Sequence, residues 1–342
     1  MTTAMLAAAA TRLQVAPGGL WLKNRRWDLT WISLSAGLVL LPFAAYEAFN
    51  FVLSFPSVRG AFGIQAVDAL DVSRNTVNAL IALLIGGPHM YATFTRTFLD
   101  GDFRKGHMAF LVGSFAVPVG VVAVGVWNFQ LLITGFFFWA SVHIMHQIAY
   151  IIDCYNGKHP RPISLQARVL DYVVVFSSLY PLGVWRMVSN NFKIGQIQLL
   201  FPPFMMIENN PALGWTLFLT VTALFVGSLL LWGRKSFEEH KRGLLHGPKF
   251  LLMSLTIVVA FFIPLYHELD VAFQGFNTWH SFQYLGLTLY VNQVRGQNVR
   301  IQTRLIRNLS QVGKGWRFYA FTPGCSLATI VVIAALDRKS VV

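Results

Sequence analysis

The chain has 342 residues, of which 55% are hydrophobic and only 12% are charged, whereas a soluble domain carries about 25% charged residues. This composition excludes a water-soluble globule, and the mean hydropathy of +0.54 favours repeated passage through a membrane. A net charge of +13 is typical of some nucleic-acid-binding proteins. Here most Lys and Arg residues fall in short loops between apolar runs, so no nucleic-acid partner is expected.

Apolar runs of membrane length predict an all-α, polytopic transmembrane helix bundle of about nine spans, within a range of about eight to ten. The predicted spans are 29–53, 73–98, 107–128, 129–152, 167–190, 211–233, 249–268, 272–293 and 318–336. Residues 1–28 are interpreted as a cytoplasmic, amphipathic N-terminal lead-in, residues 29–336 as a single transmembrane domain, and residues 337–342 as a short C-terminal tail.

The distribution of basic residues predicts the topology. Most of the 27 Lys and Arg residues precede the first span or follow the second, fourth, sixth and eighth spans, which places the N-terminus in the cytoplasm. The short loops and the lack of a recognisable targeting peptide favour a bacterial inner membrane. Trp127 and Asn128 predict a tight connection between the third and fourth spans, and residues 190–211, with Pro202 and Pro203, predict an interfacial or re-entrant element.

The histidines carry the functional argument, because ionisable groups inside a membrane are costly and usually mark a site. Four of the nine lie within predicted spans: His89, His143, His146 and His280. At about 1.5 Å of rise per residue, His89 and His143 lie at similar depth, while His280 lies several ångströms deeper. Whether His267, at the outer interface, joins them is left open. The remaining histidines lie in or beside basic loops and are interpreted as solvated; they are His107, His159, His240 and His246.

Three predicted spans carry polar stripes at helical spacing, so that each stripe occupies one helix face. The second span has His89, Thr93, Arg96 and Asp100, preceded by Gly86, Gly87 and Pro88, which allow close helix approach and a kink. The fourth span has Trp139, His143, His146, Tyr150 and Asp153. The eighth span has Asn277, His280 and Tyr284, with Gln283 beside them.

Imidazole nitrogens suit iron, copper and zinc, and an apolar pocket with open coordination positions suits iron chemistry with O₂. We therefore expect a non-haem iron site whose ligands are His89, His143, His146 and His280. We expect four polar residues to orient the imidazole rings or to hold a bound water: Gln147, Asp153, Asn277 and Gln283. Tyr150 and Tyr284 are the candidate catalytic groups, because their hydroxyls can donate hydrogen bonds to an oxygen species. Tyr91 is a further donor of this kind.

The motifs HxxHQ, from His143 to Gln147, and HxxQY, from His280 to Tyr284, resemble degenerate copies of the HxxHH boxes of membrane fatty-acid desaturases and hydroxylases. The number of intramembrane histidines is more similar to the Brp/Blh family of membrane carotenoid dioxygenases, and Gly87-Pro88-His89 resembles the early Pro-His element of that family. This resemblance covers a few residues on three helices. It implies a mononuclear iron held by four histidines on transmembrane helices.

The leading functional hypothesis is an integral membrane oxygenase that uses O₂ to oxidise or cleave a lipophilic substrate, such as a carotenoid, another isoprenoid or a fatty acyl chain. Its expected partners are this substrate, membrane lipids and, if the reaction needs one, an electron-donor protein. The first alternative is a b-type haem protein in which two histidines bind haem for electron transfer. A transporter and a structural subunit of a membrane complex are further alternatives.

Overall fold

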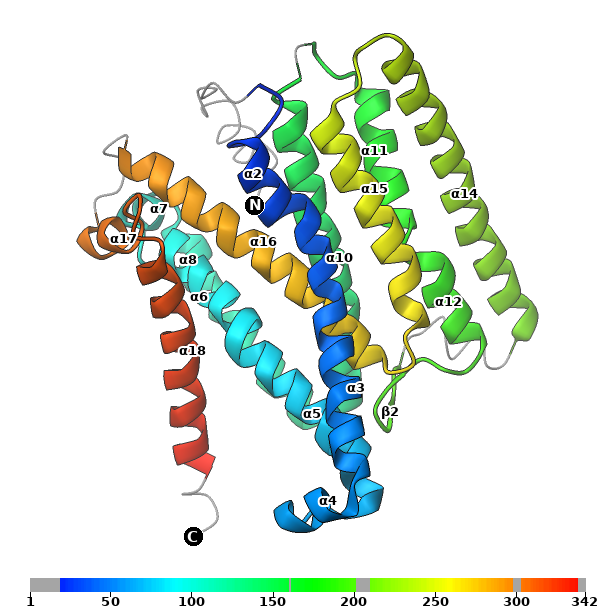
Figure 1. Ribbon diagram of the computed structural model, residues 1–342, viewed down its shortest axis with the longest axis vertical. Coiled ribbons are helices and arrows are strands. Elements are labelled where there is room, and N and C mark those ends of the chain that lie inside the picture. Colours follow the sequence, from blue (N-terminus) through cyan, green and yellow to red (C-terminus); the bar gives the residue numbers. More distant parts are fainter. Residues whose placement is uncertain (1–18, 160, 201–209, 298–302, 338–342) are drawn as a thin grey trace. The chain divides into compact units, whose positions relative to one another are not determined.

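The structure is a computed structural model that describes residues 19–159, 161–200, 210–297 and 303–337. These residues form helices joined by short connections and a single two-stranded hairpin, which confirms the predicted all-α fold (Figure 1). The chain divides into two compact units. Unit 1 comprises Met1–Gly37 and Phe129–Phe273, and unit 2 comprises Leu38–Asn128 and Gln274–Val342. The single domain expected over residues 29–336 stays a prediction.

Seven helical stretches of the described chain are long and apolar enough to cross a membrane, so the chain is a polytopic membrane protein. They are Arg25–Ser54, Ala66–Arg96, Met108–Trp127, Phe129–Asn156, Leu165–Val188, Pro211–Lys241 and Gly247–Leu265. The two further predicted spans also form long helices, α16 (Leu269–Gln297) and α18 (Trp316–Asp337), but neither is among these seven. Helix α16 is not among them because its many amide and hydroxyl side chains lower its hydropathy.

Unit 1 is built from long helices that pack side by side. Its helices are α2 (Arg25–Asp28), the π-helix η1 (Leu29–Ser33), α10 (Phe129–Asn156), α11 (Leu165–Ser177), α12 (Tyr180–Val188), α14 (Pro211–Lys241), α15 (Gly247–Phe262) and the 3-10 helix η5 (Ile263–Leu265). Helix α11 contacts α10, α14 and α15. Ser164 caps α11 by accepting a hydrogen bond from the backbone of Ala167.

A short antiparallel hairpin connects α12 and α14 in unit 1. Strands β1 (Lys193–Ile194) and β2 (Ile197–Gln198) pair so that Lys193 lies opposite Gln198. The predicted interfacial or re-entrant element, residues 190–211, therefore begins as a hairpin, which the sequence reasoning missed. The rest of that prediction, over residues 201–209 with Pro202 and Pro203, lies outside the described residues.

Unit 2 contains more and shorter helices. They are α3 (Leu40–Ser54), α4 (Pro56–Phe62), the 3-10 helix η3 (Ala66–Asp68), α5 (Ala69–Ile81), the π-helix η4 (Ala82–Gly86), α6 (Gly87–Arg96), α7 (Gly101–Gly106), α8 (Met108–Ser114), α9 (Ala116–Trp127), α17 (Arg304–Leu309) and α18. The 3-10 helix η2 (Leu34–Val39) and α16 each continue from one unit into the other.

The second span departs from regular α-helix where the sequence predicted a kink. The π-helical turn η4 comes directly before Pro88, whose ring cannot fit into a regular helical hydrogen-bond ladder. Close approach is also confirmed, because a Cβ added to Gly87 would lie 2.0 Å from Oγ of Ser326 on α18. Only glycine therefore lets α6 lie this close to α18, the two helices that run side by side in Figure 1.

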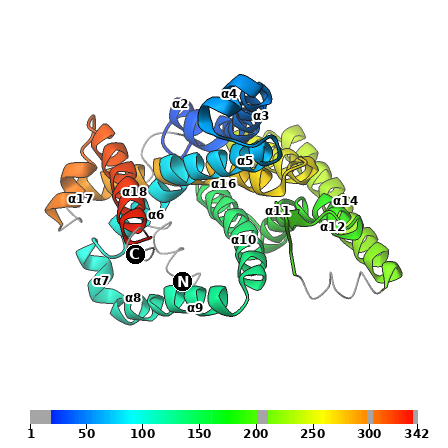
Figure 2. The same cartoon turned by 90° about the horizontal axis from the view of Figure 1, so that it is seen from below.

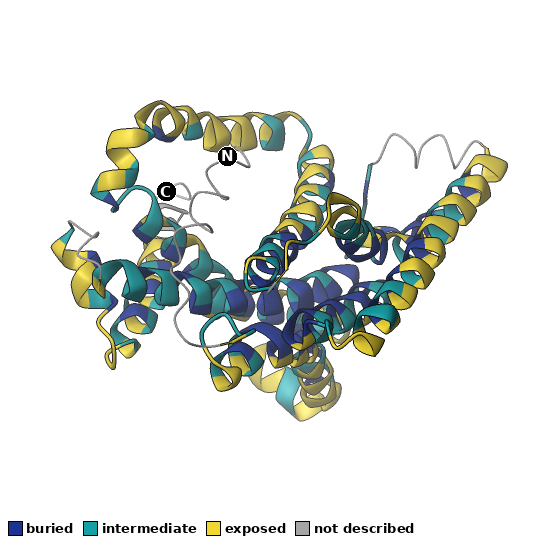
Figure 3. Ribbon diagram, turned by 90° about the horizontal axis from the view of Figure 1, so that it is seen from above, coloured by how far each residue is buried: buried dark blue, intermediate teal, exposed yellow. Residues whose placement is uncertain are grey.

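The polar helix α16 and the apolar helices α8 and α9 differ sharply in burial. Helix α16 is buried or half-buried along almost its whole length, including Trp279 and Gln283 at 0% exposure. Helices α8 and α9 follow one another almost in line (Figure 2) and are exposed along most of their surface (Figure 3). A buried polar helix and an exposed apolar one are the expected arrangement in a bundle whose outer surface contacts lipid.

Candidate metal centre

Two of the four predicted histidine ligands meet within unit 2. The ring centroids of His89 on α6 and His280 on α16 lie 4.8 Å apart, with an angle of 57° between the ring planes. A ring nitrogen of each residue lies within 4.8 Å of the other. Two nitrogens bound to one metal lie no more than about 4.2 Å apart, since each bond is about 2.1 Å long. A small side-chain adjustment would therefore let both imidazoles bind the same ion.

Tyr284 closes one side of this histidine pair. Its ring packs edge-on against His89 with centroids 4.3 Å apart, and it lies one helical turn after His280. The hydroxyl of Thr93, one turn after His89, donates to the hydroxyl oxygen of Tyr284 at 3.1 Å. The predicted stripes of the second and eighth spans therefore face each other, and the catalytic role of Tyr284 stays a prediction.

The contacts between these two helices continue as a series that we call the polar ladder. It comprises His89, Thr93, Thr95, Arg96 and Asp100 from α6 and its C-terminal turn, and His280, Tyr284, Asn292 and Arg295 from α16. Beyond Tyr284, the Asn292 amide donates to the Thr95 hydroxyl at 3.3 Å, and Arg96 donates to the Asn292 carbonyl oxygen at 3.4 Å. Both sets of residue numbers rise together, so α6 and α16 run parallel, as the predicted topology requires.

Ionic contacts end the polar ladder beyond α6. Asp100 is 3% exposed, forms an ion pair with Arg295 and lies 3.7 Å from the Arg96 guanidinium. Burial alone would raise the pKa of the Asp100 carboxyl, but the hydrogen bond and charge of Arg295 and the charge of Arg96 outweigh it, so this pKa lies below its usual range. Asp100 also caps α7 by accepting from the backbone of Asp102 and Phe103. The Asp100 carboxylate therefore links the end of α6, the start of α7 and α16.

The depth mismatch expected for His280 does not appear. Counting from span ends placed His280 deeper than His89, yet their rings are in contact. The reason is that α6 ends at Arg96 and the chain turns away into α7, whereas α16 continues to Gln297. Equal distances from the predicted loops therefore do not correspond to equal heights along these two helices.

The other two predicted ligands, His143 and His146, belong to α10 in unit 1. They lie three residues apart on one face, as predicted, and both side chains are exposed. The opposite face of α10 carries the core of this unit, including Ile148 and Ile152 at 0% exposure. That these two histidines bind the same metal as His89 and His280 stays a prediction.

The residues assigned to orient the imidazoles have varied surroundings. The Asn277 amide donates to Gln274 at 3.1 Å and its oxygen accepts from Ser281 at 3.2 Å, so these hydrogen bonds run along α16. Gln283 is fully buried on the same helix. In unit 1, Gln147 is 8% exposed on the core side of α10, and Asp153 forms an ion pair with Arg168 on α11. The assigned roles stay predictions.

The remaining candidates lie on different surfaces. The Tyr91 hydroxyl forms a hydrogen bond with Thr329 on α18, and Tyr150 is half-buried on α10, one turn from His146. After α15 in unit 1, the ring of His267 packs against Tyr266. The backbone carbonyl of His267 accepts a hydrogen bond from the buried Arg186 guanidinium at 3.0 Å. Arg186 also donates to the carbonyls of Pro264 and Tyr266, so this segment is held by a buried cation that the sequence reasoning did not single out.

Sequence reasoning also missed a buried ion cluster in unit 1. Asp171 on α11 is 0% exposed and pairs with Lys235 on α14 and with Lys249 on α15, the latter at 3.0 Å. Lys249 donates in addition to Asn156 at 3.0 Å. A signal for this cluster was present, because Asp171 is an ionisable residue within a predicted apolar span. Glu239 adds a second carboxylate at 4.0 Å from the Lys235 ammonium, so that both lysines are paired with carboxylates, which is typical of a structural connection between helices.

The prediction that His246 is solvated is wrong. This side chain is 1% exposed, caps α15 by accepting from the backbone of Lys249, and packs against the rings of Tyr155 and His159. Burial, together with the charges of Lys249 and His159, lowers the pKa of His246 to about 4. Tyr155 in turn donates to the buried carboxylate of Asp28 at 2.8 Å. A basic loop can thus contain a buried neutral imidazole.

Comparison of the chain with protein-family models, with curated proteins and with solved structures gives no match. The function is therefore inferred from the residues and their geometry.

Proposed function

We propose that the protein is an integral membrane non-haem iron oxygenase that oxidises or cleaves a lipophilic substrate with O₂. The observation that carries the proposal is the contact between His89 and His280, two imidazoles from different helices of a membrane-embedded bundle. Histidine nitrogens are suitable iron ligands, and two of them leave coordination positions for further ligands and O₂. When bound, the iron would supply the activation of O₂.

The geometry of this pair favours non-haem iron over the b-type haem alternative. In a bis-histidine haem the two imidazoles lie on opposite faces of the porphyrin, with the iron between them. The rings of His89 and His280 contact each other directly, with centroids 4.8 Å apart. A porphyrin does not fit between rings at this separation, so these two residues are unsuitable as its axial ligands.

Residues of this chain would bind and position the reactants. The Tyr284 ring fixes one side of His89, and its hydroxyl, held by Thr93, lies where it can donate to an oxygen atom near the imidazoles. On α10, His143 and His146 are exposed next to the exposed apolar side chains of Phe136 and Trp139. A hydrocarbon substrate diffusing in the bilayer would reach this face directly, without crossing water.

We further propose a bacterial inner membrane location with a cytoplasmic N-terminus. In unit 1 the hydrogen bond of Tyr155 to Asp28 and the contacts of Lys249 with Asn156 and Asp171 bring the end of α2, the end of α10 and the start of α15 to one end of the helices. The basic residues Lys158, Arg161 and Arg168, and those between Arg234 and Lys249, lie at this end of the helices. Basic residues therefore gather at the end of unit 1 that also carries α2. This supports the cytoplasmic N-terminus that the distribution of Lys and Arg predicts.

The proposal is tested by the iron content of purified variants. We expect His89→Gln and His280→Gln to lose most of the iron found in the wild-type protein, measured by mass spectrometry of detergent-purified samples. His240→Gln is the matched control, because this exposed histidine lies at the end of α14 and contributes to no ring contact with the pair. His143→Gln and His146→Gln test whether the α10 histidines complete the ligand set.

Folding and metal binding are separated by a second measurement. Each variant should elute as a monodisperse protein with the helical circular dichroism of the wild type. Full iron content in both the His89 and His280 variants would overturn the proposed centre. Iron loss in His240→Gln to the same extent would also overturn it, because the loss would then not depend on the pair.

A further inference from the structure

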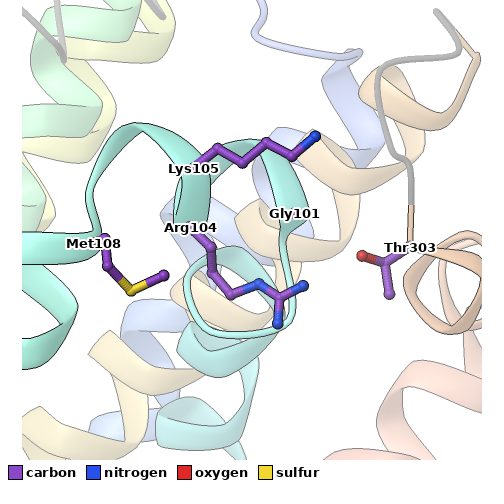
Figure 4. A pocket seen from close by; sticks show the side chains of 5 residues that line it. All are labelled: Gly101, Arg104, Lys105, Met108 and Thr303. Carbon is purple, nitrogen blue, oxygen red and sulfur yellow. The ribbon is translucent and has the colours of Figure 1, made fainter.

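We propose that the pocket at α7 binds the phosphate headgroup of an anionic phospholipid. The pocket has a volume of about 380 Å³ and is lined by Gly101, Arg104, Lys105, Met108 and Thr303. All of these residues belong to unit 2, and Figure 4 shows the side chains of Arg104 and Lys105 extending from α7 toward the side on which Thr303 lies. The inference does not depend on the proposed oxygenase function.

The two cations of this pocket are available for an external anion. Among the residues that the structure describes, the nearby carboxylates Asp100 and Asp102 both pair with Arg295 on α16, and no carboxylate pairs with Arg104 or Lys105. Arg104 and Lys105 are exposed neighbours in one short helix. A guanidinium and an ammonium on the same pocket wall give charge-assisted hydrogen bonds to phosphate oxygens.

The opposite wall of the pocket is held in place by the fold. The Thr303 hydroxyl donates to the backbone carbonyl of Leu99 at 2.6 Å, which ties the start of α17 to the segment after α6. Helix α17 adds the exposed side chains of Arg304 and Arg307 next to this wall, so the positive potential extends beyond the pocket itself.

The apolar side of the pocket identifies a lipid as the occupant. Met108 is 56% exposed and begins the stretch Met108–Trp127, of which only 6% is buried within the protein. The pocket therefore lies where a lipid-facing helix leaves the membrane, the level at which phospholipid headgroups are found. An acyl chain can follow the exposed side chains of α8 while the headgroup phosphate occupies the cationic pocket.

Native mass spectrometry of the full chain in detergent tests the proposal, with phosphatidylglycerol and phosphatidylcholine of identical acyl chains as probes. We expect the wild-type protein to prefer phosphatidylglycerol. The double variant Arg104→Gln/Lys105→Gln should bind it about tenfold more weakly, since each basic residue contributes to attraction of an anionic lipid. The charge-conserving variant Arg104→Lys/Lys105→Arg should retain most of the preference.

The matched control is Lys314→Gln/Arg317→Gln, which removes two basic residues of the same unit that do not line the pocket. This control should bind phosphatidylglycerol like the wild type. Equal weakening in both double variants would overturn the proposal in favour of general charge attraction, and unchanged binding in the pocket variant would also overturn it. Displacement of the lipid by inorganic phosphate at equal concentration would indicate a site for free anions instead of a headgroup.

Discussion

The polar ladder of unit 2 and the Asp171 ion cluster of unit 1 are two different ways of placing polar side chains between membrane helices. The ion cluster places one buried carboxylate between two ammonium groups, and Glu239 adds a second carboxylate beside Lys235. The ladder instead runs along two parallel helices and changes character: it consists of imidazole rings and hydroxyls from His89 to Tyr284, and becomes ionic only at Asp100 and Arg295.

This difference separates structural from functional candidates. Charges that compensate one another within a cluster are already used in holding helices together, and they have little capacity for a ligand. Imidazole rings offer ring nitrogens to which a metal can bind. On this basis we interpret Asp171 and its lysines as a connection between helices, and we propose metal binding only for His89 and His280.

The largest effect is expected from breaking the ion cluster. Asp171→Asn leaves Lys235 and Lys249 without their carboxylate, and an uncompensated buried charge costs about 3–5 kcal/mol of unfolding free energy. The matched control is Glu238→Gln, which removes a carboxylate that is 45% exposed and paired with Arg234 on the surface of α14. Thermal unfolding in detergent checks both; equal stability of Asp171→Asn and the control would contradict the structural role.

The next effect depends on pH and concerns His246. Because its pKa is about 4 in the folded protein and 6.5 unperturbed, the unfolded state binds a proton first as the pH falls. The folded state therefore loses stability between about pH 6.5 and pH 4, by at most about 3 kcal/mol. Replacement by Asn retains a helix cap but does not titrate.

The thermal midpoint of the wild-type protein should thus fall more steeply between pH 7.5 and pH 4.5 than that of His246→Asn. The control is His240→Gln, which changes an exposed histidine and should follow the wild type. Parallel curves for wild type and His246→Asn would show that burial of this imidazole does not govern the acid sensitivity.

A smaller loss is expected at the ionic end of the ladder. Asp100→Asn keeps a side-chain oxygen that can cap α7 but removes the charge opposite Arg295 and Arg96. Both guanidinium groups are partly exposed, so water compensates them in part, and we expect a loss of about 1–2 kcal/mol. Chemical denaturation of the variant checks this value; a loss as large as that of Asp171→Asn would remove the contrast between the two regions.

The smallest effect is expected beside the histidines. Thr93→Val removes the hydroxyl that donates to Tyr284, at a cost of about 1 kcal/mol. Because Thr93 contacts Tyr284 and not the imidazole nitrogens in this arrangement, iron content should remain near that of the wild type while turnover with O₂ falls. Loss of iron as complete as in His280→Gln would place Thr93 in the support of the metal itself.

The sequence predicts the helices and their polar faces because both depend on local spacing. The stripe from His89 to Asp100 follows the helical period, and Gly87 and Pro88 indicated the close approach and the departure from regular α-helix. The partners of the stripe could not be predicted in the same way. Which residue of α16 lies opposite His89 depends on the relative register of two helices separated by almost two hundred residues, and that register follows from tertiary packing.

The local sequence pattern also does not predict which individual polar residues are buried. His246 lies in a basic loop and is nevertheless enclosed by Tyr155 and His159, which come from a distant part of the chain. Asp171, in contrast, carried a usable signal, since an acidic residue in an apolar helix requires a buried partner. Lysines at the ends of neighbouring predicted spans are the natural partners for such a carboxylate, and Lys235 and Lys249 occupy such positions.

The most direct test of the account is the metal content of the purified wild-type protein together with its optical spectrum. The account predicts iron bound in a defined ratio to the protein, no Soret band, and loss of that iron in His89→Gln and His280→Gln but not in His240→Gln. A Soret band would assign the histidines to haem and electron transfer. Protein that binds neither iron nor haem would contradict the metal centre and leave the polar ladder as a structural or transport element.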